Sequence, residues 1–258
     1  MKKRVITLVL TLVMLLSISV PAAAKSCSHD YGSTDVCSKC GHLRVHSFDR
    51  SITFYTAKQN VPVWSQPTKY SDKVTTITEQ DTLVEIDGIL RNKYENIWLK
   101  VAGETQYIYI DNLYLWFESL VVQNLQMIIP FENKTTQLAA FYDAVKPGSY
   151  ADYKCWLDPG NKQFTYKVRF GTDNYYDLTA EELGNIHYGY LGRAFGLDSD
   201  GLLYAGGVVN QILKFLRDPW NAVKEISDEC TNYYCDTEED ATDVKRGIDY
   251  FDTGVLNN

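Results

Sequence analysis

The feature that most constrains this fold is a change of sequence pattern near residue 117. Between residues 50 and 117, short runs of alternating and β-branched residues are separated by turn residues. The runs cover residues 52–56, 61–64, 73–78, 82–86, 97–101 and 106–110. Short strands at such close spacing predict a small closed all-β barrel.

After residue 117, apolar residues recur at helical spacing instead. Helices are predicted at about 120–129, 135–145, 180–195, 202–216 and 236–251, with one strand or hairpin arm at 163–170. Thr179 and Glu182 have capping-box spacing, so their side chains would satisfy free N–H groups at the start of the third helix. Residues 118–258 are therefore predicted to form an α+β domain.

The first 24 residues have the pattern of a secretory signal peptide. Lys2, Lys3 and Arg4 precede an uncharged, mostly apolar run, and Ala22 to Ala24 supply the small residues that a signal peptidase needs. The alternative is a membrane anchor, for which the run is short. Removing residues 1–24 would change the net charge from −8 to −11, and the mature chain would be secreted or associated with the cell wall.

The six cysteines fall into two groups of three. In the first, Cys27 and His29 precede a Cys37-Ser-Lys-Cys40-Gly knuckle, and these four side chains would fill a tetrahedral zinc site with no open position. Because residues 25–49 are too few to bury a core, zinc would supply their folding energy. His42 and His46 are spare nitrogen ligands, and disulfides or oxidised thiols are the alternative in an exported chain.

The second group is Cys155, Cys230 and Cys235. One pair could form a disulfide, which leaves an odd thiol, or all three could be buried and inert. The sequence does not decide their pairing.

Four glycines fall within residues 184–196, which cover most of the predicted helix at 180–195 and the residue after it. Each costs a helix about 1 kcal/mol relative to Ala, so the cost indicates close backbone packing, a break, or a nearby ligand. His187 shares a face with Leu183 and Leu191, and it therefore points either into the core as a hydrogen-bonded imidazole or into a cleft.

Two parts of the chain before residue 118 resemble known small modules. The Cys27-x-His29…Cys37-x-x-Cys40-Gly pattern resembles zinc ribbons of secreted Gram-positive proteins. Residues 61–67, 81–86, 98–101 and 107–115 follow the order of landmarks in bacterial SH3-like domains, apart from a long insertion at 88–96 and Gln106 in place of glycine. That resemblance implies binding to cell-wall peptide or glycan. The aromatic residues that could line a groove are Trp64, Tyr70, Trp98, Tyr107 and Tyr109.

The last 125 or so residues resemble the polymorphic toxin type 44 domain of bacterial toxin systems. The segments that carry the likeness are residues 141–154, 184–196 (a "GN.hYG..G...G" pattern), 203–211 and 236–250. Glu238 stands where proline is usual, and Ala241 where glutamine is usual. The fold class implied for the whole chain is multidomain, with a zinc-ribbon-like segment at 25–49, an SH3-like barrel at 50–117 and the α+β domain at 118–258.

The toxin resemblance implies RNA cleavage and a possible immunity-protein partner. Metal-free cleavage needs a group that accepts the 2′-OH proton, an acid for the leaving oxygen, and donors for the phosphate. The residues expected to act in catalysis are His187, Asp240 and Asp243. Those expected to bind substrate are Asn185, Tyr188, Arg193, Gln211 and Lys245.

The acidic charge of residues 118–258 favours functions other than RNA cleavage. Residues 118–258 contain 12 basic and 22 acidic residues, so this region repels an RNA polyanion over most of its surface. Paired carboxylates, such as Asp240 with Asp243 or Asp177 with Glu181, could instead hydrolyse wall glycan or peptide. A secreted binding or scaffold protein without activity is a further alternative. The sequence has no phosphate loop, dinucleotide fingerprint, HExxH or GxSxG pattern, which disfavours nucleotide-dependent, zincin and α/β-hydrolase chemistry.

Overall fold

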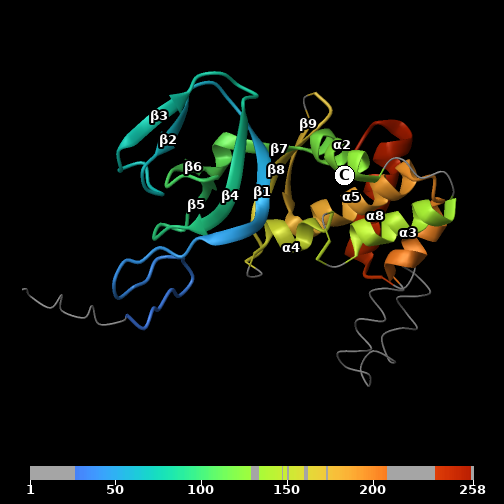
Figure 1. The fold of residues 1–258 in the computed structure, drawn as a ribbon, viewed down its shortest axis with the longest axis horizontal. Coiled ribbons are helices and arrows are strands. Elements are labelled where there is room, and N and C mark those ends of the chain that lie inside the picture. Colours follow the sequence, from blue (N-terminus) through green and yellow to red (C-terminus); the bar gives the residue numbers. More distant parts are fainter. Residues whose placement is uncertain are drawn as a thin grey trace, which may run out of the picture.

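The computed structural model describes residues 27–128, 134–146, 148–149, 151–159, 162–172, 174–207 and 236–256. The predicted signal peptide, Gln211, Cys230 and Cys235 lie outside these residues. A strand-rich half and a helix-rich half lie side by side, and the small N-terminal segment that precedes β1 (blue) lies below the strands (Figure 1). Among the described helices, none is both long enough and apolar enough to cross a membrane.

The strand-rich half contains β1 (His46–Thr56), β2 (Val61–Trp64), β3 (Lys73–Ile77), β4 (Leu83–Arg91), β5 (Ile97–Val101), β6 (Tyr107–Tyr109) and β7 (Leu113–Trp116), with a 3-10 turn η1 (Ile110–Asn112). The six predicted runs are therefore strands. β1 starts earlier than predicted, and it has an irregular register between Ser47 and Ile52 where it pairs with β4. Residues 88–91 of the predicted insertion at 88–96 extend β4 and pair with β5, and residues 92–96 form the turn between these strands.

The helix-rich half contains α2 (Phe117–Ile128), α3 (Lys134–Val145), α4 (Tyr153–Leu157), α5 (Ala180–Ala194) and α8 (Glu238–Thr253), together with a helical stretch at 199–207. β8 (Thr165–Phe170) and β9 (Asn174–Thr179) form the predicted hairpin, although only the first arm was apparent from alternation. Thr179 and Glu182 form the predicted capping box. α8 begins two residues after the predicted start at 236 and is capped by Thr237, whose side chain accepts from the backbone N–H of Asp240.

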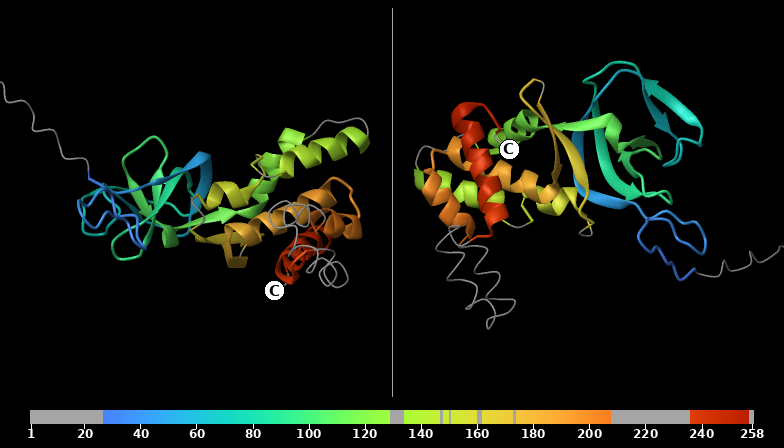
Figure 2. Two further views of the ribbon diagram at one scale, coloured as in Figure 1. Left: turned by 90° about the horizontal axis from the view of Figure 1, so that it is seen from below. Right: turned by 180° about the vertical axis from the view of Figure 1, so that it is seen from behind.

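One sheet joins the two halves. Its strand order is β3-β2-β6-β5-β4-β1-β7-β8-β9. β7 pairs antiparallel with β1 and parallel with β8, so the sheet passes through the predicted boundary at residues 117 and 118 (Figure 2). The strand pairings recorded for the described residues do not close this sheet on itself, although it curls strongly in Figure 1.

Side-chain packing continues across the same junction. A single hydrophobic cluster includes Phe54 of β1, Leu115 of β7, Val168 of β8 and Leu183 of α5. The guanidinium of Arg169 in β8 lies over the rings of Tyr114 and Trp116 and forms an ion pair with Asp81 at 3.2 Å. The two halves are therefore one packed unit, because core and sheet are shared.

Candidate functional site

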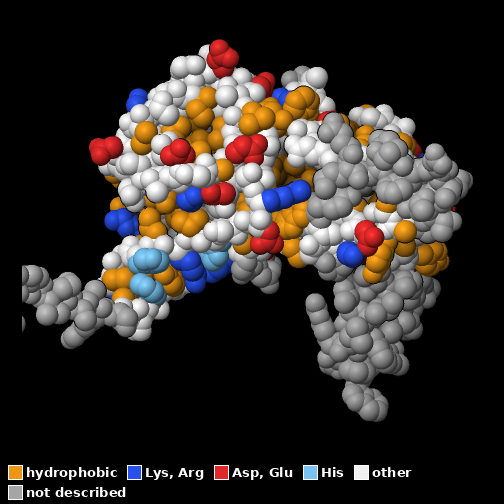
Figure 3. Space-filling view, in the orientation of Figure 1, with side chains coloured by type: hydrophobic (Ala, Val, Ile, Leu, Met, Phe, Trp, Pro, Cys, Tyr) orange, Lys and Arg blue, Asp and Glu red, His pale blue; other side chains and the backbone are white. Residues whose placement is uncertain are grey.

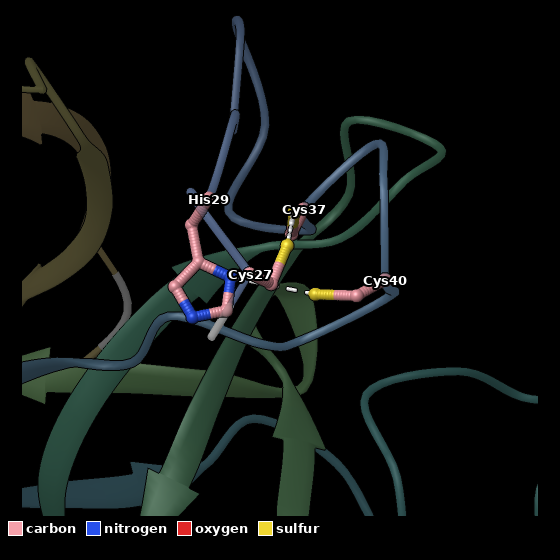
Figure 4. Close-up of side chains that lie close together, drawn as sticks. All are labelled: Cys27, His29, Cys37 and Cys40. Atoms are coloured by element: carbon pink, nitrogen blue, oxygen red, sulfur yellow. Dashed lines mark hydrogen bonds between the residues drawn. The ribbon is translucent and has the colours of Figure 1, made fainter. Parts of the chain in front are cut away.

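Four side chains of the N-terminal segment converge as the cysteine spacing predicts. The ligand atoms of Cys27, His29, Cys37 and Cys40 all lie within 4.8 Å of one another (Figure 4). Three sulfurs and one imidazole nitrogen form a donor set that suits a tetrahedral metal. Among the described cysteines none forms a disulfide, so this group of residues could bind a metal.

The backbone around Cys37 is shaped for a thiolate. Asp30 N donates to the Cys37 sulfur at 3.4 Å, and Gly41, at φ 72°, closes the knuckle by donating to the Cys37 carbonyl. Burial opposes ionisation of Cys37, but the Asp30 N–H, His29 and the N–H groups of Lys39 and Cys40 outweigh it and lower its pKa to about 5. A knuckle that stabilises a negative sulfur is what a bound cation requires.

His42 and His46 have other contacts. The His42 ring stacks on His29 at 4.6 Å between centroids, and its Nδ1 lies 2.8 Å from the Tyr31 hydroxyl. His46 Nε2 lies 2.7 Å from Asp35, which is 1% exposed and also accepts from the backbone N–H of Arg91 in β4. Through His46 of β1 and Arg91 of β4, Asp35 attaches the segment to the strands. Figure 3 shows histidines (pale blue) on this segment.

Close contact between α5 and α8 explains one of the four glycines, Gly189, and also Gly247 of α8. A Cβ atom at Gly189 would lie 2.1 Å from the carbonyl oxygen of Val244, and one at Gly247 would lie 1.9 Å from that of Ile186. Neither position can accept a side chain. A Cβ atom at Gly192 would meet Leu202 at 2.1 Å, while Gly196 has φ 78° just after α5. Close packing therefore explains Gly189 and Gly192, and the left-handed backbone conformation explains Gly196.

Gly184 leaves room for a lysine from another element. A Cβ atom there would approach the Lys154 side chain at 3.1 Å, and Lys154 of α4 continues past it to Glu181 at 3.2 Å and Asp240 at 3.9 Å. Asn185 Nδ2 donates to the same Asp240 oxygen at 2.5 Å. We call Lys154, Asn185, Glu181 and Asp240 the polar cluster.

The polar cluster is partly open to solvent. The Lys154 side chain is 41% exposed and that of Asp240 is 19% exposed, so both are in contact with solvent. Lys154, Asn185 and Asp240 come from three of the segments that carry the toxin resemblance, so these three segments meet at the polar cluster. Lys154 was missed as a site residue, although it ends the first segment of the toxin resemblance.

Asp243 lies one helical turn beyond Asp240 and is only 8% exposed. Burial raises its pKa to about 6, although its ion pair with Arg246 at 2.9 Å opposes the shift. The nearby Glu182 and Asp240 charges act in the same direction as burial. Asp243 therefore differs from an ordinary surface carboxylate by keeping a proton up to a higher pH.

His187 lies in the core rather than in a crevice. It is 0% exposed, and its ring packs edge-on against Tyr153 and Phe117. Its Nε2 lies 3.0 Å from Asn124 Nδ2 of α2, and that amide also donates to the Tyr153 hydroxyl. Burial lowers the His187 pKa to about 3, so the ring is neutral and has no path to a substrate in this arrangement.

The remaining expected site residues have partners within the fold. Tyr188 donates to the Leu202 carbonyl, and Arg193 contacts Asp252 and the Leu197 carbonyl. Lys245 forms an exposed i,i+4 ion pair with Asp249. The structure therefore brings Asn185 and Asp240 together, with Asp243 beside them.

A comparison with known protein families finds a match in the part of the chain that contains the polar cluster. A family model described as Bacterial toxin 44 matches residues 145–253, which include α4, α5 and α8 and all of the polar cluster. No curated protein and no solved structure matches the chain. The C-terminal region is therefore of the bacterial toxin type.

Proposed function

We propose that this chain is an exported toxin whose C-terminal region cleaves RNA at the polar cluster. The observation that carries the proposal is the meeting of Lys154, Asn185 and Asp240, which come from three separate elements inside the toxin-type region. The partly exposed ammonium group of Lys154, beside the Asp240 carboxylate that Asn185 holds by a hydrogen bond, suits a reaction at a phosphate.

The chemistry follows from the groups at hand. The Asp240 carboxylate, oriented by Asn185, would take the proton of an RNA 2′-OH, whose oxygen then attacks the adjacent phosphorus. Lys154 would stabilise the charge on the phosphate oxygens. Asp243, protonated below its pKa of about 6, would give its proton to the departing 5′ oxygen. The products are a 2′,3′-cyclic phosphate and a free 5′-OH.

A second candidate is hydrolysis of wall glycan or peptide, with Asp240 and Asp243 as paired carboxylates. The charge of the chain favours it, because residues 118–258 carry a net −10. Acidic and basic side chains are also interspersed on the face drawn in Figure 3. An RNA substrate would then depend on local contacts with Lys154 rather than on long-range attraction.

The other parts of the chain serve delivery in this proposal. Zinc would be held by Cys27, His29, Cys37 and Cys40 and would stabilise the N-terminal segment without taking part in the reaction. The strand-rich half would hold the exported chain at the cell wall. An immunity protein would protect the producing cell by covering the polar cluster.

The test uses the chain from residue 25, which retains every described residue. Incubation with labelled RNA and, separately, with purified wall sacculi distinguishes RNA fragments ending in cyclic phosphate from soluble muropeptides. Asp240→Asn and Lys154→Gln should reduce RNA cleavage at least about 100-fold. The matched controls are Asp143→Asn and Lys146→Gln, which alter an exposed ion pair at the end of α3 and should leave the rate unchanged. Cleavage unaffected by Asp240→Asn would overturn the assignment.

A further inference from the structure

Two exposed tyrosines stand together at one end of the strand-rich half, on loops far apart in sequence. Tyr70, in the loop between β2 and β3, is 76% exposed, and Tyr94, between β4 and β5, is 53% exposed. Their ring centroids are 6.5 Å apart with an angle of 70° between the planes. The sequence pointed to Tyr70 but not to Tyr94, whereas Trp98 and Tyr107 are largely buried in a small second core.

A buried amide fixes the two loops to each other. Asn92 is 4% exposed, and its Nδ2 donates to the Pro67 carbonyl of the other loop at 2.8 Å. Its Oδ1 accepts from the backbone N–H groups of Tyr94 and Asn96. The rings are thus held in place before any ligand arrives, which lowers the entropic cost of binding.

Each ring has a lysine beside it. Lys69 Nζ lies 5.5 Å from the Tyr70 centroid, and Lys93 Nζ lies 4.9 Å from that of Tyr94. Neither lysine forms an ion pair within the described part of the chain, where Lys100, Lys146 and Lys154 all do. Within the two loops, Asp72 and Glu95 balance the charges of Lys69 and Lys93, and Lys73 at the start of β3 brings the local net charge to +1 on a chain of −8.

We propose that Tyr70 and Tyr94 bind an anionic polysaccharide of the cell wall. A tyrosine offers an apolar ring face for the C–H face of a sugar and a hydroxyl for its polar edge. The free ammonium groups of Lys69 and Lys93 would pair with phosphate or carboxylate substituents. An uncharged glycan would use the rings but not the lysines, and an apolar peptide would not need the charges.

This inference rests on the proposed wall association of the strand-rich half, and it names the site and the ligand. The probe is a Gram-positive sacculus that retains its phosphate-rich polymer, compared with the same sacculus stripped by hydrofluoric acid. The chain from residue 25 should bind the intact sacculus, and stripping should weaken binding about tenfold. Raising the salt concentration should do the same, because screening weakens the lysine contacts.

Variants distinguish this site from the rest of the surface. Tyr70→Ala and Tyr94→Ala should each weaken binding about tenfold, and Lys69→Gln with Lys93→Gln should remove the salt dependence. The control is Tyr142→Ala, since Tyr142 is 60% exposed on α3. If the parent binds but the Tyr70 and Tyr94 variants bind equally well, this site is wrong while wall association stands. If the parent does not bind, both fail. Equal binding to stripped sacculi overturns the anionic ligand.

Discussion

Gly189 of α5 and Val244 of α8 lie so close that a Cβ atom on the glycine would be 2.1 Å from the valine carbonyl oxygen. Because the obstacle is backbone, Gly189→Ala must push the two helices apart. We expect a loss of about 3 kcal/mol or more in the free energy of unfolding, measured by urea denaturation.

The matched control is Gly206→Ala in the helical stretch at 199–207. A Cβ atom there would meet its nearest neighbour at 3.7 Å, an ordinary contact. That change should be neutral or stabilising by up to about 1 kcal/mol, since alanine favours a helix. Similar losses in both variants would show that helix crossing does not explain the glycines.

His187 should make the fold sensitive to acid. Its pKa of about 3 in the fold lies below the ordinary 6.5, so below pH 6.5 the unfolded chain binds a proton that the folded chain excludes. Stability should therefore fall by about 2 kcal/mol between pH 7 and pH 5 from this residue alone. His187→Gln should lack that loss, so the stability curves of parent and variant should converge toward low pH. Parallel curves would contradict the buried, neutral assignment.

The same variant tests whether His187 takes part in the reaction. Because the ring is 0% exposed, folded His187→Gln should retain RNA cleavage to within a few-fold of the parent. A loss of more than about 100-fold in a variant that unfolds cooperatively would restore His187 as a catalytic residue.

Asp243 should act on stability in the opposite direction. Its pKa of about 6 lies above the ordinary 3.8, so its contribution is greatest at low pH and declines as pH rises from about 4 to about 6. Asp243→Asn has no carboxyl group at this position, so its side chain stays neutral at every pH in this range. The variant should gain about 2–3 kcal/mol relative to the parent over this range, by urea denaturation at each pH. A constant difference would contradict the raised pKa.

The cysteine cluster should bind one zinc ion per chain, as measured by metal analysis after dialysis. Cys37→Ser should abolish that binding, because it removes a thiolate from a closed ligand set. It should also expose residues 27–45 to protease. Cys155→Ser is the control, since Cys155 is an exposed free thiol outside the cluster, and it should keep the metal. Retention of zinc by the Cys37 variant would exclude the proposed ligand set.

The toxin-type region should not fold when cut away at residue 118. Such a fragment loses β7, the parallel neighbour of β8, and the Tyr114 and Asp81 side chains that contact Arg169. We expect the fragment 118–258 to lack a cooperative thermal transition, while the chain from residue 25 unfolds cooperatively. A stable, cooperative fragment would show that the shared sheet is dispensable.

Features that depend on neighbours along the chain could be predicted without coordinates. Alternation located the strands from β2 to β6, the Thr179 and Glu182 spacing marked the start of α5, and the Cys37–Cys40 knuckle identified the cluster of side chains that could bind a metal. These predictions succeed because strand pleating, helix capping and the geometry of a CxxC knuckle each depend on only a few neighbouring residues.

Only the tertiary structure decided what depends on distant partners. The pattern around His187 fits a core position and a cleft equally, and the aromatic wall from Phe117 and Tyr153 makes it core. Lys154 reaches Asp240 across 86 residues of chain, and Tyr94 meets Tyr70 only because Asn92 bonds to Pro67. Such contacts arise from how α4, α5, α8 and the loops pack against one another, which no local periodicity records.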